Sequence, residues 1–136
     1  MTLVHGTCVS VQGKGVLLLG PSGSGKSDLA LRLIDGGAAL VSDDQVEMSA
    51  VKKTLIASAP RGLEGLFEVR GVGIFQLPYE PKATLSLAVT LVTRSAVERM
   101  PEQEFWGCLG LQVPLLSLHA FDDSICAKIR LILQTA

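Results

Sequence analysis

The chain has 136 residues, of which 48% are hydrophobic and 18% charged, and its formal net charge is −1. This length predicts one domain, residues 1–136, with enough apolar side chains for a buried core. The balanced charge argues against nucleic acid as the main partner, and no apolar stretch approaches the roughly 18 residues of a membrane span. The first residues lack a basic segment followed by a long apolar one, so we expect no signal peptide.

The three cysteines are Cys8, Cys108 and Cys126, which are widely spaced and form no C-x-x-C or Cys/His cluster. An odd number in this pattern predicts neither a disulfide framework nor a zinc site. We expect them to be small core or surface residues of a reduced, cytoplasmic protein.

Two strands are predicted near the start of the chain, at Val9–Gln12 and Gly15–Leu19, with Gly13-Lys14 as the tight turn between them. The second strand is continuously apolar, which is typical of a central strand covered on both faces.

The next eight residues, Gly20-Pro21-Ser22-Gly23-Ser24-Gly25-Lys26-Ser27, fit the P-loop pattern G-x-x-x-x-G-K-[ST] at every fixed position. Such a loop wraps its backbone N–H groups around a phosphate chain at a helix N-terminus, which makes a nucleoside triphosphate the default ligand. Lys26 would reach the β- and γ-phosphates, and the Ser27 hydroxyl would ligate Mg²⁺. The alternative is a Gly/Ser-rich turn, which the flanking strand and helix disfavour.

A helix is predicted at Asp28–Asp35, with Asp28 and Arg32 spaced for a weak ion pair and Gly36-Gly37 as its C-cap. A buried strand, Ala38–Val41, follows, and together these elements predict a right-handed βαβ unit with parallel strands. The apolar residues of the helix share one face: Leu29, Ala30, Leu33 and Ile34.

The rest of the chain predicts an α/β fold with a mixed, β-rich sheet and few helices. Ser124 is the predicted cap of a final helix. Four strands are predicted at Gln45–Met48, Thr54–Ser58, Leu66–Val69 and Leu85–Val92, with Lys52-Lys53 as a polar turn. Residues predicted to share a face are Leu85, Leu87, Val89 and Leu91 in the last strand, and Ile125, Ile129, Ile132 and Leu133 in the helix.

Two carboxylates, Asp43 and Asp44, end an apolar strand after the P-loop. P-loop enzymes hold Mg²⁺ or activate a nucleophile at such a position. Adjacent side chains at a strand end point in different directions, so one could take a proton from an attacking hydroxyl while the other holds the metal. The residues alone do not separate these roles, and a polar turn is the structural alternative.

His5, Glu68 and Arg70 are further candidates. His5 is expected to begin a strand that pairs with the one before the P-loop, from which it could orient a carboxylate base. Glu68 and Arg70 share a face of a strand that ends in glycines, where Glu68 could bind metal and Arg70 could stabilise a transferred phosphoryl group. A structural ion pair is the alternative for these two. We expect packing or surface roles for His119, Trp106 and Asp122-Asp123.

Four segments together resemble the catalytic C-terminal domain of the HPr kinase/phosphorylase family in order and spacing, over about residues 3–92. The segment Glu68-Val69-Arg70-Gly71-Val72-Gly73 is the most specific of them. The other three are His5-Gly6, Gly20–Ser27 and Val41-Ser42-Asp43-Asp44. The resemblance implies a nucleotide-binding core similar to that of phosphoenolpyruvate carboxykinase, and assembly as a homohexamer.

The resemblance also implies an ATP-dependent, Mg²⁺-dependent serine kinase that acts on HPr, a phosphocarrier of the bacterial phosphotransferase system. By motif, Asp43 would be the base, His5 would lie near it, and Arg70 would stabilise the transferred group. Ser27, Asp44 and Glu68 would serve Mg²⁺. ATP would be held by Gly20, Pro21, Ser22, Gly23, Ser24, Gly25, Lys26 and Ser27.

The chain departs from this pattern in two places. It shows no separate N-terminal domain before His5, as expected for a short form. Residues 113–121 contain no Arg-Pro-Gly-Arg-like loop, which the family associates with the reverse, phosphorolytic reaction. We therefore expect kinase activity with weak or no phosphorylase activity. A small-molecule kinase or NTPase on the same core, and a nucleotide-gated binding module, stay open as alternatives.

Overall fold

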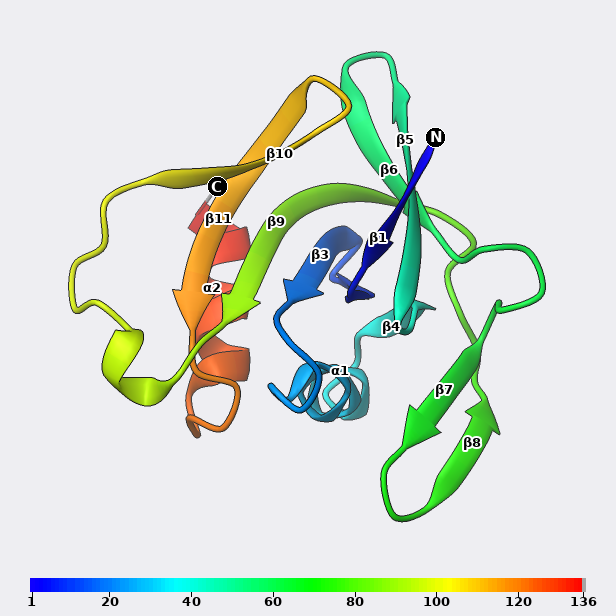
Figure 1. Ribbon diagram of the computed structural model, residues 1–136, viewed down its shortest axis with the longest axis horizontal. Coiled ribbons are helices and arrows are strands. Elements are labelled where there is room, and N and C mark those ends of the chain that lie inside the picture. Colours follow the sequence, from blue (N-terminus) through cyan, green and yellow to red (C-terminus); the bar gives the residue numbers. More distant parts are fainter. Residues whose placement is uncertain (136) are drawn as a thin grey trace.

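One curled sheet and two α-helices make up most of the molecule in the computed structural model, which describes residues 1–135 (Figure 1). The helices are α1 (Lys26–Asp35) and α2 (Ile125–Thr135), with a short 3-10 turn, η1 (Arg94–Ala96). The strands are β1 (Thr2–His5), β2 (Thr7–Val11), β3 (Lys14–Leu19), β4 (Ala39–Ser42), β5 (Gln45–Val51), β6 (Thr54–Ser58), β7 (Leu66–Val69), β8 (Gly73–Gln76), β9 (Ala83–Leu91), β10 (Glu104–Cys108) and β11 (Leu111–Leu118). This is the mixed, strand-rich α/β fold with few helices that the sequence predicts.

The main sheet has nine strands in the order β1-β5-β6-β9-β3-β2-β4, with β11 also paired to β9 and β10 paired to β11. Only the β3–β9 and β9–β11 pairs are parallel. β7 and β8 form a separate hairpin that projects from one end of the molecule (Figure 1).

The sheet buries side chains on both of its faces. Val16 and Leu18 of β3 lie in a core shared with α1 and α2, whereas Leu17 lies in a second core that the β5–β6 part of the sheet closes. All three side chains are fully buried. The prediction that this strand is covered on both faces is confirmed.

The predicted βαβ unit has parallel strands, as expected, but the two strands are not neighbours in the sheet. β4 follows α1 and runs in the same direction as β3, but β2 lies between them and pairs antiparallel with both. β2 and β9 occupy the two positions beside β3, so β4 pairs with β2 instead. The carboxyl ends of β3 and β4 still meet at one edge of the sheet, one strand apart.

β9 also departs from its predicted alternation. Leu85 lies in the second core, whereas Leu87, Val89 and Leu91 lie in the first. The pairing with β3 steps from Gly15–Leu85 to Val16–Leu87, so β9 has one extra residue there. Such a bulge bends a strand and reverses the faces on its two sides, and β9 arches from β6 to β3 and β11 in Figure 1.

The hairpin turn and helix boundaries are shifted by one or two residues. The turn between β2 and β3 is Gln12-Gly13, with φ angles of 52° and 82°, rather than Gly13-Lys14. These angles fit the two-residue turn that matches strand twist, and Lys14 is left to open β3. The Lys52-Lys53 turn is confirmed, with φ angles of 49° and 63°.

Helix α1 begins at Lys26, two residues earlier than predicted, and its C-terminal cap is confirmed. The N–H of Gly37 donates to the Ile34 carbonyl and that of Ala38 to the Leu33 carbonyl. Gly37 has a φ of 111°. This is the Schellman pattern, in which a glycine takes the left-handed position that closes the last helical turn.

The predicted strands omit β1, β8, β10 and β11. β1 pairs with β5, so His5 ends a strand at the edge of the sheet instead of beginning one beside β3. Pro114 obscures β11 in the sequence, because proline cannot donate to a sheet. The fold tolerates it because Pro114 lies opposite Phe105 of β10, outside the Leu115–Leu118 segment that also pairs with β9.

Helix α2 confirms the predicted final helix, which begins directly after Ser124. Ile125, Ile129 and Leu133 are buried in the first core, and Ile132 packs against it. No helix in the described residues 1–135 is long and apolar enough to cross a membrane.

Candidate functional site

The glycine-rich loop between β3 and α1 fixes Lys26 at the start of the helix. Gly20, Gly23 and Gly25 have positive φ angles of 147°, 82° and 100°. A side chain at Gly20 would also meet Ser24, since its Cβ would lie 2.6 Å from the Ser24 Oγ. The loop therefore needs glycine at these positions both for its backbone conformation and for its tight path.

Lys26 is buried, and its ammonium group hydrogen-bonds to two carbonyls of the loop. Its side chain is 8% exposed, and Nζ donates to the carbonyl oxygens of Gly20 at 2.6 Å and Pro21 at 3.1 Å. Ser24 Oγ is buried and has no hydrogen-bond partner in residues 1–135. A buried ammonium and an unpartnered hydroxyl in one loop suit a multiply charged phosphate ligand.

Asp43 is bound into the floor of the site. Its Oδ1 accepts hydrogen bonds from Ser27 Oγ and Thr7 Oγ1, both at 3.1 Å. Its Oδ2 accepts one from the backbone N–H of Glu68 at 3.3 Å. Three donors from α1, β2 and β7 therefore hold this carboxylate next to the hydroxyl of Ser27.

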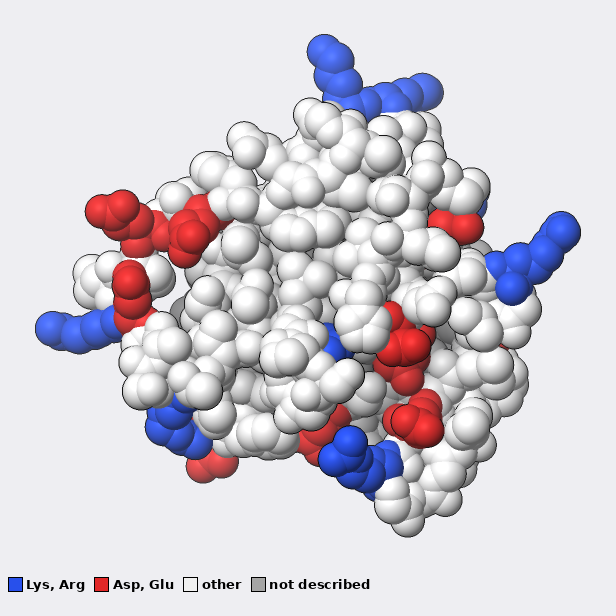
Figure 2. All heavy atoms as spheres, in the orientation of Figure 1, with Lys and Arg blue, Asp and Glu red and all other residues white. Residues whose placement is uncertain are grey.

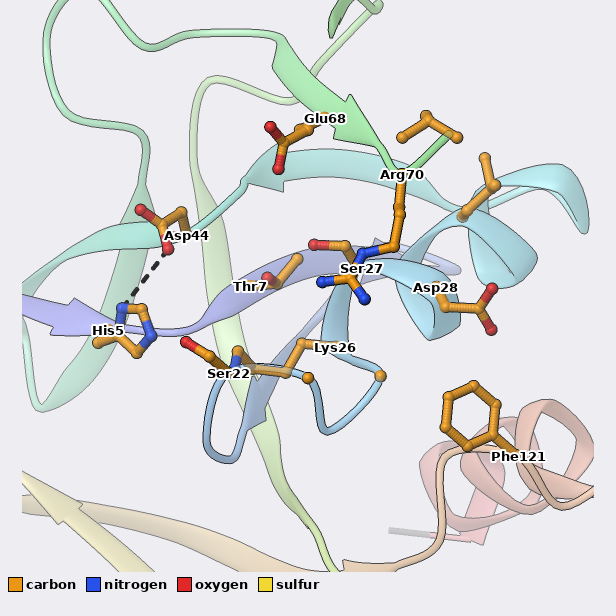
Figure 3. A pocket seen from close by; sticks show the side chains of 14 residues that line it. His5, Thr7, Ser22, Lys26, Ser27, Asp28, Asp44, Glu68, Arg70 and Phe121 are labelled. Atoms are coloured by element: carbon orange, nitrogen blue, oxygen red, sulfur yellow. Dashed lines mark ion pairs between the residues drawn. The ribbon is translucent and has the colours of Figure 1, made fainter. Parts of the chain in front are cut away.

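Asp44 lies beside Asp43 in the chain but points toward the opening of the site, where its Oδ1 is 3.5 Å from His5 Nδ1 (Figure 3). The two side chains are 70% and 58% exposed. The N–H of Gln45 donates to the Asp43 carbonyl at 2.8 Å, which closes a three-residue turn around Asp44 with a φ of 68°. This strained backbone turns neighbouring carboxylates in different directions, as the sequence predicts.

Gly6 holds that turn in place. Its N–H donates to the Asp44 carbonyl at 3.0 Å. A Cβ on Gly6 would lie 2.8 Å from the carbonyl oxygen of Leu18, so only glycine lets β1 and β2 pass this close to β3. The His5-Gly6 pair thus supplies a side chain and a backbone donor to Asp44.

Glu68 and Arg70 come from the β7–β8 hairpin and face the same space, and both are exposed. In Figure 3 the Glu68 carboxylate points into the cavity between Asp44 and Ser27, and the Arg70 guanidinium extends toward Ser27. Glu68 and Arg70 form no salt bridge with each other within residues 1–135, so the alternative of a structural ion pair does not hold. Phe67, buried in the first core, anchors the hairpin beside α1.

A cavity of about 550 Å³ joins these groups, a volume typical of small-molecule sites. Of the predicted site residues, it gathers His5, Ser22, Gly23, Gly25, Lys26, Ser27, Asp44, Glu68 and Arg70. Residues that the sequence did not single out for the site also line it: Thr7, Asp28, Leu31, Val69 and Phe121. Thr7 and Phe121 belong to none of the predicted motifs, and only the tertiary fold brings them to the cavity. In Figure 2, acidic side chains gather where β4 meets β5 and beside the hairpin, while much of this face is uncharged.

Within residues 1–135 no three His, Cys, Asp or Glu side chains form a ready-made metal site. The donors present are the Ser27 hydroxyl, the Asp43 carboxylate bound to it, and the carboxylate of Glu68. Mg²⁺ is commonly held by one or two carboxylates together with substrate phosphates and water. The donor set therefore fits Mg²⁺ that arrives with a nucleotide.

The cysteines lie outside the cavity and are free. Burial raises the pKa of Cys8, on β2 directly after Thr7, to about 12, despite an opposing backbone hydrogen bond. Burial also raises the pKa of Cys108. Both shifts favour the neutral thiol over the reactive thiolate, in agreement with the predicted packing roles.

Comparison with known proteins assigns the family. The sequence pattern described as HPr Serine kinase C-terminal domain matches residues 1–120. The chain belongs to this family. The match includes all the predicted site residues and stops one residue before Phe121.

Individual relatives agree with this assignment. The chain is 42% identical over 130 residues to an HPr kinase/phosphorylase of Bordetella avium, covering 87% of this chain and 42% of that one. It is 51% identical over 74 residues to one of Caldicellulosiruptor bescii, covering 54% of this chain and 24% of that one. The chain thus spans less than half the length of these curated relatives.

The fold is also that of a solved structure, the Hpr(Ser) kinase/phosphatase from Coxiella burnetii. The TM-score is 0.88 over 99% of this chain and 90% of that one, at 23% sequence identity. The likeness covers the whole described fold, including β10, β11 and α2.

Proposed function

We propose that the chain is an ATP-dependent protein serine kinase that phosphorylates HPr. The observation that carries this proposal is the cavity, in which the Lys26 loop and an exposed carboxylate, Asp44, face the same space. The family and the names of the relatives support HPr as the acceptor. In accordance with the resemblance, we also propose a core similar to that of phosphoenolpyruvate carboxykinase, a cytoplasmic location and a homohexamer.

The loop residues Gly20–Ser27 would hold the triphosphate through backbone N–H groups and Lys26. Bound Mg²⁺ would neutralise charge on the β- and γ-phosphates. Ser27, Asp43 and Glu68 would hold it, directly or through water. Asp43 suits this role because its carboxylate is already hydrogen-bonded to the Ser27 hydroxyl.

Asp44 would be the general base, which exchanges the roles that the resemblance implies for Asp43 and Asp44. A base must reach the acceptor hydroxyl and have a free lone pair. Asp44 suits this role because its side chain is 70% exposed and, within residues 1–135, its carboxylate pairs with His5 alone, whereas the Asp43 carboxylate already accepts three hydrogen bonds. The serine oxygen would attack the γ-phosphorus, the bond to ADP would break, and the serine proton would pass to Asp44.

His5 would orient the Asp44 carboxylate from the side away from the phosphates. Arg70 would place positive charge beside the transferred group as the bond to ADP breaks. Both side chains are exposed, so docking of the acceptor protein would complete the site by excluding water from them.

Transfer of label from γ-labelled ATP to purified HPr tests this proposal. We expect label on the target serine, no label on HPr in which that serine is alanine, and loss of transfer when EDTA removes Mg²⁺. ATP hydrolysis or transfer to small molecules without any labelling of HPr would contradict the proposal and favour a small-molecule kinase or NTPase. Tight ATP binding without turnover would favour a binding module.

A further inference from the structure

An exposed aromatic ring, Phe121, lies at the cavity on the short segment between β11 and α2. Its side chain is 53% exposed, yet it lines the same cavity as Lys26 and Ser27. Nothing in the family match bears on it, because the matched region ends at residue 120. Its position relative to the glycine-rich loop indicates what it could bind.

The ring rests directly against the loop. A Cβ on Gly25 would lie 2.7 Å from the Ala120 Cβ and 3.0 Å from the Phe121 Cζ. Gly25 precedes Lys26, the first residue of α1. Phe121 therefore borders the path of any phosphate chain that the loop binds.

Arg32 fixes the segment that carries the ring, and Asp28 in turn holds Arg32. Arg32 donates a hydrogen bond to the Ala120 carbonyl, and its guanidinium lies 6.0 Å from the ring centroid of Phe121. Asp28 holds Arg32 through an ion pair of 3.0 Å, as the sequence predicts.

His119, on the same segment as Phe121, also supports the ring. Its Nδ1 is 2.9 Å from the Val92 carbonyl, and its ring meets Phe121 edge to face at 5.9 Å and 71°. An aromatic side chain that is held by a cation and a second ring, yet remains half exposed, is preorganised to receive a flat ligand.

The cavity has two ends. In Figure 3, His5 and Asp44 lie at one end, and Asp28 and Phe121 lie at the other, with Lys26 and Ser27 between them. In the proposed function the reacting γ-phosphate lies toward Asp44. The triphosphate then runs along the loop, and its nucleoside leaves at the end that holds Phe121.

We propose that Phe121 forms a nucleobase subsite, in which the base of the nucleoside triphosphate stacks on the exposed face of the ring. This inference rests on the proposed function. Stacking on an aromatic ring tolerates any base, since every base has a π-face. The subsite would therefore make the chain bind a nucleotide more tightly than a bare polyphosphate. It would bind ATP and GTP with similar affinity.

Calorimetric titration with two probes, MgATP and magnesium tripolyphosphate, tests the subsite. We expect Phe121→Ala to weaken ATP binding by about 5- to 100-fold, in the range measured for stacked bases, and to leave tripolyphosphate binding unchanged. Phe121→Tyr keeps the ring and is expected to bind ATP as the unmodified chain does. Phe105→Ala on β10 is the matched control, because Phe105 is 52% exposed and lies outside the cavity.

Unchanged ATP affinity in Phe121→Ala would overturn the subsite. An equal loss for ATP and tripolyphosphate would also overturn it, because the ring would then only support the loop. If the unmodified chain failed to bind tripolyphosphate, and Lys26→Ala left ATP binding unaltered, the proposed function would fail instead, and the subsite with it.

Discussion

The floor and the rim of the cavity are built in different ways. The floor consists of Thr7, Lys26 and Ser27, which line the cavity, together with Asp43, which does not line it but accepts hydrogen bonds from Thr7 and Ser27. These residues are buried or half-buried, and Lys26 is hydrogen-bonded to the glycine-rich loop. The rim consists of His5, Asp44, Glu68 and Arg70, which are all exposed, and the only ion pair among them is His5–Asp44.

In the proposed function, this difference would separate two tasks of phosphoryl transfer. Binding a charged nucleotide and its metal requires donors and acceptors whose positions are fixed beforehand. Accepting a protein serine requires side chains that remain accessible until the partner docks. The boundary passes between Asp43 and Asp44, so adjacent carboxylates have different surroundings.

The largest effect is expected for a change in the floor. Lys26→Met keeps the length of the side chain and removes its charge, so we expect nucleotide affinity and transfer rate to fall together, the rate by about 10²- to 10³-fold. Titration calorimetry and labelled transfer measure the two quantities. Lys52→Met, in the exposed β5–β6 turn, is the control and should change neither. Normal ATP affinity in Lys26→Met would show that the charge of Lys26 does not bind the nucleotide.

The link between floor and rim is tested at Gly6. Gly6→Ala places a Cβ 2.8 Å from the Leu18 carbonyl, and we expect a loss of about 1–3 kcal/mol in the free energy of unfolding, as for other overpacked sites. Transfer should also fall because the Asp44 turn is displaced. Urea unfolding measures the first effect. Gly107→Ala is the matched control, because its nearest atom would be 3.8 Å away; equal stability loss in both variants would contradict the close packing.

A smaller effect isolates one hydrogen bond of the floor. Thr7→Val keeps the shape of a side chain that is 1% exposed and removes the donor to Asp43. We expect the free energy of unfolding to fall by about 1 kcal/mol and the affinity for MgATP to fall, with little change for ATP alone. Thr7→Ser, which keeps the hydroxyl, should retain Mg²⁺-dependent affinity. The same affinity loss in both variants would argue against the hydrogen bond.

The smallest effect concerns the burial of Cys8, which follows the floor residue Thr7 on β2. The pKa of Cys8 is raised from 9.0 to about 12 by burial, so the folded chain keeps this proton where the unfolded chain loses it. Cys8 therefore stabilises the fold below about pH 9, and this stabilisation is lost as the pH rises toward 12. Urea unfolding at pH 8 and pH 10 in reductant should show a greater loss of stability for the unmodified chain than for Cys8→Ala. Identical losses would mean that Cys8 ionises equally in both states.

Elements with a strong local pattern could be predicted from the sequence. The apolar run of β3, the glycine-rich loop, the Gly36-Gly37 cap and the amphipathic α2 each depend on a few neighbouring residues. The pairing of strands could not be predicted in this way, because it depends on contacts between distant segments. For the same reason β2 was not expected beside β4, and the bulge in β9 was not visible in its alternation.

The site shows the same limit. The glycine-rich loop and the carboxylate pair are local motifs, but whether Asp43 or Asp44 faces the opening depends on Thr7, Gly6 and the φ of 68° at Asp44. Gly6 belongs to the His5-Gly6 segment of the family resemblance, but neither Gly6 nor Thr7 predicts this geometry from the sequence. Phe121 is held at the cavity by packing against Arg32 and His119, and no sequence motif predicts these contacts.

The most direct test of the division between floor and rim compares Asp44→Asn with Asp43→Asn in labelled transfer to HPr, with MgATP affinity measured on the same samples. Asparagine also tolerates the left-handed backbone at Asp44. We predict that Asp44→Asn lowers the transfer rate by about 10²- to 10⁴-fold at unchanged MgATP affinity, as for a lost general base. Asp43→Asn should weaken MgATP binding itself. The reverse pattern, with normal transfer in Asp44→Asn and normal MgATP affinity without transfer in Asp43→Asn, would contradict this assignment and make Asp43 the base.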